Sequence, residues 1–111
     1  EERYQNLLSK PKLSSHIIAV GMARDPKRSV PEVEELGAVF CAVQNMYLTA
    51  TAYGIGCYLS TGGITYFENA QQILGWDDSI TLIGFMHIGI PKEMQKSGKR
   101  GTLDDKVEWH S

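Results

Sequence analysis

The stretch that decides the fold runs from Ser29 to Gly54 and reads SVPEVEELGAVFCAVQNMYLTATAYG. Its larger apolar side chains recur at alternating steps of three and four, which is the spacing of one helical face. These residues are Val33, Leu36, Phe40, Val43, Tyr47 and Ala50. A second face carries small side chains that let another element approach closely, namely Ala38, Cys41, Ala42, Thr49 and Ala52. The pattern predicts a helix that is buried on two sides.

Both ends of this helix carry sequence signals. Ser29 and Glu32 have the spacing of a capping box, and Pro31 is tolerated in a first turn. Three glutamates come soon after Pro31, where negative charge suits the positive end of the helix dipole. Gly54 is a natural stop at the other end.

The middle of the chain is free of charge. No Asp, Glu, Lys or Arg lies between Leu36 and Phe67, and all eleven Lys and Arg fall in two blocks, at 3–28 and 92–106. Charged residues are rarely buried, so a long run without them indicates burial. A chain of 111 residues can hardly enclose a helix by itself. We therefore expect this stretch to pack against a second copy, and the chain to be part of a longer protein.

Composition excludes several classes of protein. With 42% hydrophobic and 22% charged residues, neither disorder nor a disulfide scaffold is expected. Two cysteines favour a reducing compartment, the cytoplasm, and a net charge of −2 gives no general attraction for nucleic acid. A membrane span needs about 20 consecutive apolar residues. Gln44, Asn45 and several threonines interrupt the charge-free run, so no membrane partner is expected.

Two apolar runs predict strands around this helix. Residues 16–22 are rich in β-branched side chains and suit a buried strand. Residues 80–89 are apolar on both faces, which is typical of a central strand, and Pro91 ends them. Residues 1–15 form a poorly defined lead-in.

Between the long helix and the second strand we expect a shorter helix. Thr65 and Glu68 repeat the capping-box spacing, the apolar residues after them suit an amphipathic helix, and Gly75 ends it. After the second strand, residues 92–111 are polar and basic, with one late apolar anchor at Trp109.

Two segments are candidates for binding, each with a plainer alternative. The loop 60–63 (Ser-Thr-Gly-Gly) could let a planar ligand lie against its backbone N–H groups, or it could be a simple turn. Lys96, Lys99 and Arg100 could hold a phosphate, or could be a solvated tail. The three histidines lack metal-like spacing, and His87 suits a structural role within its apolar strand. No metal site and no catalytic side chain are assigned.

Taken in order, these segments resemble the C-terminal half of the FMN-dependent nitroreductase family. Residues 44–56 (QNMYLTATAYGIG) resemble the helix of that family, and 59–62 (LSTG) resemble its flavin-facing loop. Residues 83–91 are similar to its last core strand, and Lys99 with Arg100 resemble its terminal basic pair.

The resemblance implies an α+β fold with a mixed or antiparallel sheet flanked by helices, in an obligate homodimer with FMN at the interface. Residues 16–91 would be the C-terminal portion of that domain, and the basic tail 92–111 would wrap the partner subunit. Such enzymes take hydride from NAD(P)H and reduce nitroaromatic compounds, quinones or related acceptors by a ping-pong mechanism.

The resemblance also assigns roles to residues. Leu59, Ser60, Thr61 and Gly62 would line the isoalloxazine ring, with the Thr61 and Gly62 backbones near flavin N5 and O4. Arg100, with Lys99 beside it, would contact the FMN phosphate. The alternative is a truncated, non-catalytic dimeric module that binds flavin, since nothing before His16 resembles the N-terminal half of the family. This fragment alone would be inactive.

Overall fold

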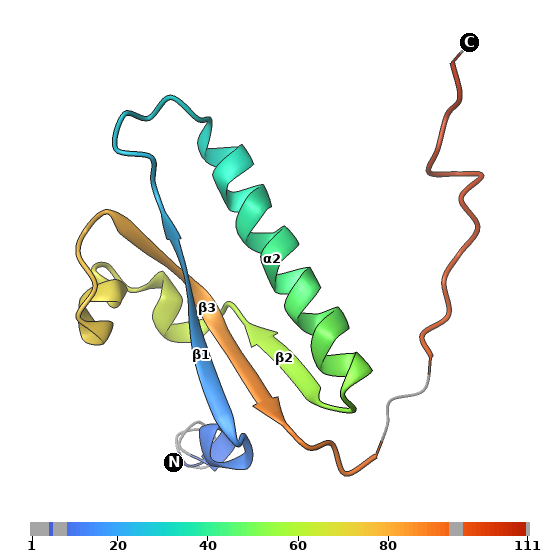
Figure 1. The fold of residues 1–111 in the computed structure, drawn as a ribbon, viewed down its shortest axis with the longest axis horizontal. Coiled ribbons are helices and arrows are strands. Elements are labelled where there is room, and N and C mark those ends of the chain that lie inside the picture. Colours follow the sequence, from blue (N-terminus) through green and yellow to red (C-terminus); the bar gives the residue numbers. More distant parts are fainter. Residues whose placement is uncertain (1–4, 6–8, 94–96, 111) are drawn as a thin grey trace.

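A computed structural model describes residues 5, 9–93 and 97–110 of the chain, and it shows one helix packed on a small sheet (Figure 1). The sheet has three antiparallel strands in the order β1-β3-β2. The strands are β1 (His16–Ala23), β2 (Gly56–Ser60) and β3 (Ile80–Gly89), and the helix is α2 (Glu32–Ala52). Short 3-10 helices span Lys10–Leu13, Gly63–Tyr66 and Ala70–Leu74. The predicted α+β class is confirmed.

The central position expected for the second apolar run is confirmed, because β3 pairs with both other strands. Leu82, Gly84 and Met86 of this strand are buried, and Met86 is fully enclosed. Opposite β1, the register shifts by one residue between Val20 and Gly21. Such a bulge bends and twists a strand pair. The core of the chain therefore lies along β3.

The first apolar run forms a strand as predicted, but it is not a buried strand in this chain. Met22 of β1 is buried, whereas Ile17 is 42% and Ile18 38% exposed. The reason is that β1 lies at one edge of the sheet and has a single neighbour in the described residues.

The predicted capping box is wrong. Helix α2 begins at Glu32 after Pro31, and no side chain caps it. Ser29 instead donates both its backbone N–H and its hydroxyl to the Asp25 carboxylate. A charged acceptor makes a stronger hydrogen bond than a neutral one, so the loop closes on itself before the helix starts. The stop is as predicted, with Gly54 at a φ of +69°.

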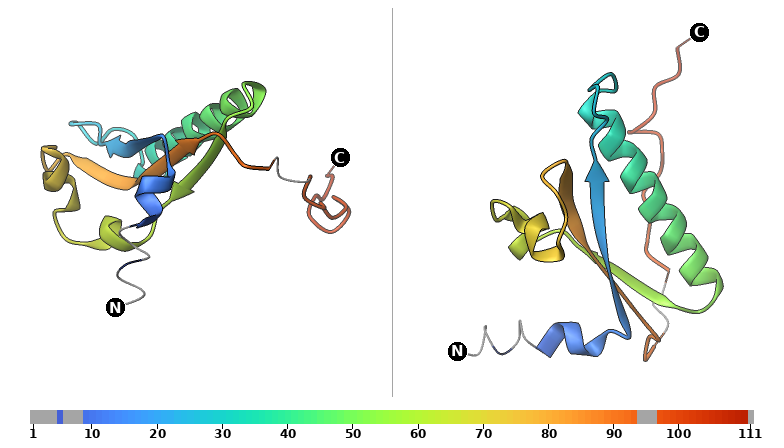
Figure 2. Two further views of the ribbon diagram at one scale, coloured as in Figure 1. Left: turned by 90° about the horizontal axis from the view of Figure 1, so that it is seen from below. Right: turned by 60° about the vertical axis from the view of Figure 1, so that its left-hand side comes forward.

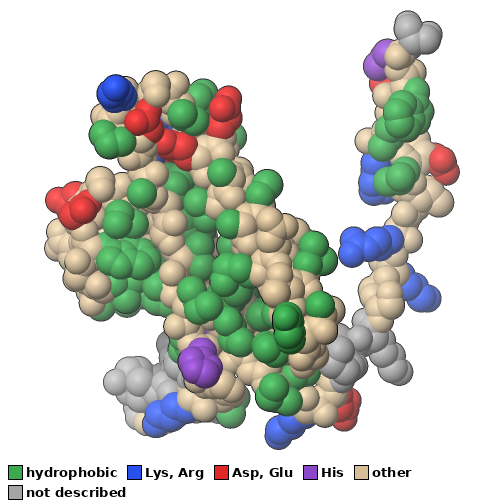
Figure 3. All heavy atoms as spheres, viewed as in Figure 1, with side chains coloured by type: hydrophobic (Ala, Val, Ile, Leu, Met, Phe, Trp, Pro, Cys, Tyr) green, Lys and Arg blue, Asp and Glu red, His purple; other side chains and the backbone are tan. Residues whose placement is uncertain are grey.

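Helix α2 is covered on one side only within the described chain. Val43 is its buried residue, while the small-residue face, including Ala38, Cys41 and Ala42, is exposed. Figure 2 shows the sheet on one side of α2, and Figure 3 shows how few charged side chains lie over the middle of the molecule. Burial on two sides is thus not reached by one chain, and the uncovered face stays an expected contact for another surface.

The short amphipathic helix predicted after Thr65 is also wrong. The segment forms two separate 3-10 helices, Gly63–Tyr66 and Ala70–Leu74. Asn69 between them has a left-handed backbone with a φ of 58°, which a continuous helix cannot contain. The Thr65 hydroxyl bonds backward to Thr61 rather than capping a helix. Gly75 ends the second piece, as predicted.

The tail leaves the body of the molecule after β3 and runs alongside it without joining the sheet (Figure 1). The radius of gyration is 17.5 Å. A compact domain of this length would have about 13 Å, so the tail accounts for an extended shape. Leu103 and Trp109 in the tail are 69% and 90% exposed. In the part of the chain that the structure describes, no helix is both long and apolar enough to cross a membrane.

Candidate functional site

The segment 59–62 begins as a strand rather than as a loop. Leu59 and Ser60 are the last two residues of β2, where they pair with Met86 and Phe85 of β3. Thr61 and Gly62 leave the sheet and are exposed. The predicted loop is therefore shorter than expected, and it starts from a fixed strand end.

Three contacts set the direction of the carbonyl groups in this segment. The Ser60 carbonyl lies against Gly84 of β3, so closely that a Cβ at Gly84 would stand 2.6 Å from its oxygen. The Thr65 hydroxyl donates to the Thr61 carbonyl at 2.5 Å and lies 3.4 Å from the Gly62 carbonyl oxygen. The loop is therefore held on both sides by its own chain.

The directions of these carbonyl groups also fix the directions of the N–H groups that follow them in the chain. In a trans peptide the C=O and the following N–H point in opposite directions, and the described residues contain no cis peptide bond. The N–H of Thr61 therefore points away from β3, and that of Gly62 points away from Thr65. No described group of the chain accepts a hydrogen bond from either. The loop presents two backbone donors at its surface.

The surface beside these donors is open. A Cβ at Gly62 would meet no atom within 4 Å. A flat ring could therefore approach this backbone closely, which a side chain in that place would prevent. The residues here fit a planar ligand with hydrogen-bond acceptors along one edge.

Tyr47 of α2 is a site residue whose role the sequence pattern does not predict. The pattern assigns it to the apolar face of the helix, and its ring is half-buried as expected. Its hydroxyl, however, accepts a hydrogen bond from the Leu59 backbone N–H at 2.6 Å. A tyrosine with its ring in the core and its hydroxyl free to reach a partner is the signal that could have indicated this.

Lys99 and Arg100 lie in the tail, and both are exposed. Figures 1 and 2 place the tail on the far side of α2 from the loop after β2. Within the described residues, neither side chain makes an ion pair. One chain thus brings Leu59, Ser60, Thr61 and Gly62 together but leaves the basic pair apart. Lys96 falls outside the described residues.

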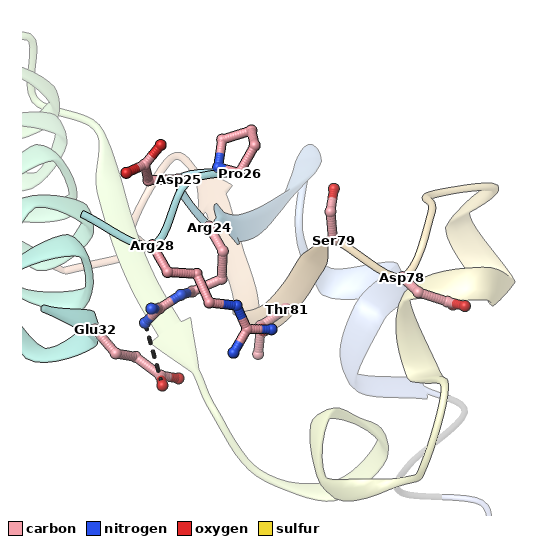
Figure 4. A pocket seen from close by; sticks show the side chains of 8 residues that line it. All are labelled: Arg24, Asp25, Pro26, Arg28, Glu32, Asp78, Ser79 and Thr81. Carbon is pink, nitrogen blue, oxygen red and sulfur yellow. Dashed lines mark ion pairs between the residues drawn. The ribbon is translucent and has the colours of Figure 1, made fainter. Parts of the chain in front are cut away.

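A second, polar cleft of about 420 Å³ opens between the loop before α2 and the turn before β3 (Figure 4). Arg24 at its base is 3.1 Å from the Glu32 carboxylate and 3.0 Å from that of Glu35. Hydrogen bonds from Ser29, its hydroxyl first, lower the pKa of Asp25 below its ordinary value. Arg24 is already paired twice, and the carboxylates of Asp25, Glu32 and Asp78 line the cleft beside Arg28, so this cleft is a weaker candidate for binding an anion.

An apolar groove of about 370 Å³ lies where α2 meets β2 and β3. Met46, Ala50 and Tyr53 of the helix end form one wall, and Cys57, Met86 and Ile88 contribute to the other. Cys57 and Cys41 are both unpaired. The groove continues the uncovered surface of the helix.

The remaining candidates have structural roles. His87 Nδ1 lies 3.0 Å from the Ser14 hydroxyl, as expected for a satisfied histidine in a strand. Hydrogen bonds from Ser79, chiefly its hydroxyl, lower the pKa of Asp77 in the turn before β3. No group of metal-binding side chains occurs in the described parts of the chain.

The fold is a helix packed on an antiparallel sheet, and the candidate site is a pair of outward backbone N–H groups at the end of one strand. The model of the nitroreductase family matches residues 5–90. This match begins before His16, where the resemblance of the motifs begins, and it ends before the tail. The chain belongs to the nitroreductase family.

Known relatives agree with this assignment. A protein of Escherichia coli K12 provisionally named NAD(P)H nitroreductase YdjA is 28% identical over 76 residues, which cover 68% of this chain and 42% of YdjA. A solved nitroreductase-like protein of Bacillus cereus has a TM-score of 0.79 and 28% identity, over 96% of this chain and 58% of that one. A provisionally assigned Desulfovibrio desulfuricans nitroreductase, solved with FMN, has a TM-score of 0.67 and 26% identity, over 83% of this chain and 53% of that one. The chain thus spans about half the length of these relatives.

Proposed function

We propose that the protein is an FMN-dependent oxidoreductase that takes hydride from NAD(P)H and reduces nitroaromatic compounds, quinones or related acceptors in a ping-pong cycle. The observation that carries this proposal is the pair of outward N–H groups at Thr61 and Gly62, in a chain of the nitroreductase family. The FMN-bound relative from Desulfovibrio supports the choice of cofactor.

When bound, FMN would supply the redox chemistry, accepting two electrons from the nicotinamide and giving them to the acceptor. The protein's part is to bind and orient the ring. Leu59 and Ser60 would form its floor at the end of β2, and the Thr61 and Gly62 amides would donate to its acceptor edge. Donors held in place before the reaction would fix the orientation of the ring for hydride transfer. No side chain has to act as an acid or base.

The phosphate of FMN would be held by Arg100, with Lys99 beside it. Because the tail lies across α2 from the loop in Figures 1 and 2, we propose that its basic pair completes the site only in the assembled protein. The assembly would be a homodimer in which the tail 92–111 wraps the partner subunit. The uncovered helix face and the exposed Trp109 support that arrangement, since the described residues of the chain cover neither.

The first test is a visible spectrum of the full-length protein, recorded before and after anaerobic addition of NAD(P)H. A flavin band that bleaches is the expected result. A flavin band that NAD(P)H does not bleach would favour the non-catalytic binding module. If no flavin band is present even after FMN is added, the proposed function is wrong.

The phosphate assignment has a sharper test, the change Arg100→Ala. A hydrogen bond to a charged group contributes about 1.5–3 kcal/mol, so the dissociation constant of FMN should rise about ten- to a hundredfold. Riboflavin, which lacks the phosphate, should bind as before. Lys106→Ala is the matched control, because Lys106 is in the same tail but 2.8 Å from Asp105. Equal loss of FMN and riboflavin binding would contradict the assignment.

A further inference from the structure

The free edge of β2 carries an unusual hydrogen bond. In the order β1-β3-β2, this strand has a neighbour on one side only within the described residues. Backbone N–H groups alternate in direction along an extended strand, so every second one points away from β3. At Leu59 that outward N–H donates to the Tyr47 hydroxyl at 2.6 Å. A helix side chain thus takes the place that a further strand would occupy.

This bond lies immediately before the two free donors of the loop. Thr61 is two residues after Leu59, so an extended chain directs its N–H toward the same side. The first outward amide is held by Tyr47, and the second is one of the two free donors. On the opposite side, Gly84 lies directly against the Ser60 carbonyl. The peptide between these restraints has little freedom to rotate or shift.

From this geometry we propose that Tyr47 is a positioning residue for the flavin, which acts through Leu59 to hold the Thr61 and Gly62 donors in place. The inference rests on the function proposed above and goes beyond it. Tyr47 itself would touch no flavin atom. Its hydroxyl fixes the strand end, and the strand end aims the donors at the N5 and O4 acceptors of oxidised FMN.

This role has a measurable signature. Oxidised FMN can accept hydrogen bonds at both N5 and O4, whereas uptake of hydride turns N5 into an N–H group that no longer accepts one. Loosened donors should therefore cost oxidised FMN more affinity than reduced FMN. By linkage, the midpoint potential of the bound flavin should rise.

The experiment compares Tyr47→Phe with Tyr53→Phe in the full-length protein. Both changes remove one hydroxyl from α2 or the residue that ends it, but Tyr53 is 79% exposed. Dissociation constants are measured for FMN in the oxidised and the anaerobically reduced state, alongside thermal unfolding. For Tyr47→Phe we expect about a tenfold rise for oxidised and about a threefold rise for reduced FMN, as the loss of about two neutral hydrogen bonds and of one would give. Tyr53→Phe should change neither.

The possible outcomes separate the two proposals. If both redox states of FMN lose affinity equally, Tyr47 is merely structural and the inference is overturned, whatever happens to the melting temperature. Unchanged affinities would overturn it as well. If the unaltered protein binds FMN in neither state, the proposed function itself fails, and the inference fails with it.

Discussion

The loop after β2 and the tail after β3 would form the two halves of one cofactor site, yet the chain holds them very differently. Three contacts restrain the loop and the strand end before it. Gly84 packs against the Ser60 carbonyl, the Thr65 hydroxyl donates to the Thr61 carbonyl, and the Tyr47 hydroxyl accepts from the Leu59 N–H. Among its described residues, the tail has local contacts only, such as a turn in which the Lys106 and Val107 N–H groups donate to the Leu103 carbonyl. In the proposed site, a single chain would thus prepare the donors for the flavin ring, whereas the cations for its phosphate would need a surface from elsewhere.

The largest effect on the difference between loop and tail is expected from Gly84→Ala, which disturbs the loop from the β3 side. The new Cβ would meet the Ser60 backbone oxygen at 2.6 Å, and backbone cannot move aside as a side chain can. Overpacking of this kind costs about 1–3 kcal/mol, so the free energy of unfolding in urea should fall by that amount.

Gly37→Ala is the control for Gly84→Ala. Gly37 lies within α2, and a Cβ there would meet no atom within 4 Å. The same substitution should raise the free energy of unfolding by up to about 1 kcal/mol, because alanine favours a helix interior. Equal effects of the two changes would contradict the close contact under Ser60.

A smaller change tests the restraint ahead of the loop. Thr65→Val keeps the shape of the side chain but removes the donor to the Thr61 carbonyl. A hydrogen bond of about 1 kcal/mol corresponds to about a fivefold weaker binding of FMN, measured by titration. Thr51→Val is matched, because it removes a similar bond to the Tyr47 carbonyl within α2. If both variants bind FMN equally well, the loop is not held as described.

The smallest effect is expected in the tail. Trp109→Ser should alter the free energy of unfolding of dilute, monomeric protein by no more than about 0.5 kcal/mol, because the ring is 90% exposed. The same change should weaken dimerisation, measured by sedimentation, if the tail wraps a partner. A large loss of stability in the monomer would show instead that Trp109 packs on its own body.

The contrast between loop and tail also explains how much could be predicted from sequence. The periodic helix, the central strand β3 and the stops at Gly54 and Gly75 arise from local patterns, and the structure contains them. The two capping-box predictions were wrong, because the Ser29 and Thr65 hydroxyls donate to other nearby acceptors, the Asp25 carboxylate and the Thr61 carbonyl. Short polar side chains choose among several acceptors, and spacing alone does not decide between them.

Strand β2 and the role of Tyr47 were beyond local patterns. Five residues from Gly56 to Ser60 are too short to be distinguished from a loop, and only pairing with β3 makes them a strand. The hydrogen bond from Leu59 to Tyr47 joins residues twelve apart on different elements. The assignments of Leu59, Ser60, Thr61, Gly62, Lys99 and Arg100 to FMN came from resemblance and stay predictions.

One contact in the sheet has an optical consequence. A Cβ at Gly21 would lie 2.7 Å from the Trp76 ring, so the indole rests directly on the backbone of β1. The chain has only one other tryptophan, Trp109, at its exposed end. Fluorescence from Trp76 should therefore be shifted to the blue and shielded from acrylamide, while that of Trp109 should be red and readily quenched. A blue shift of the Trp109 emission on dimerisation would show that the tail has packed against the partner subunit.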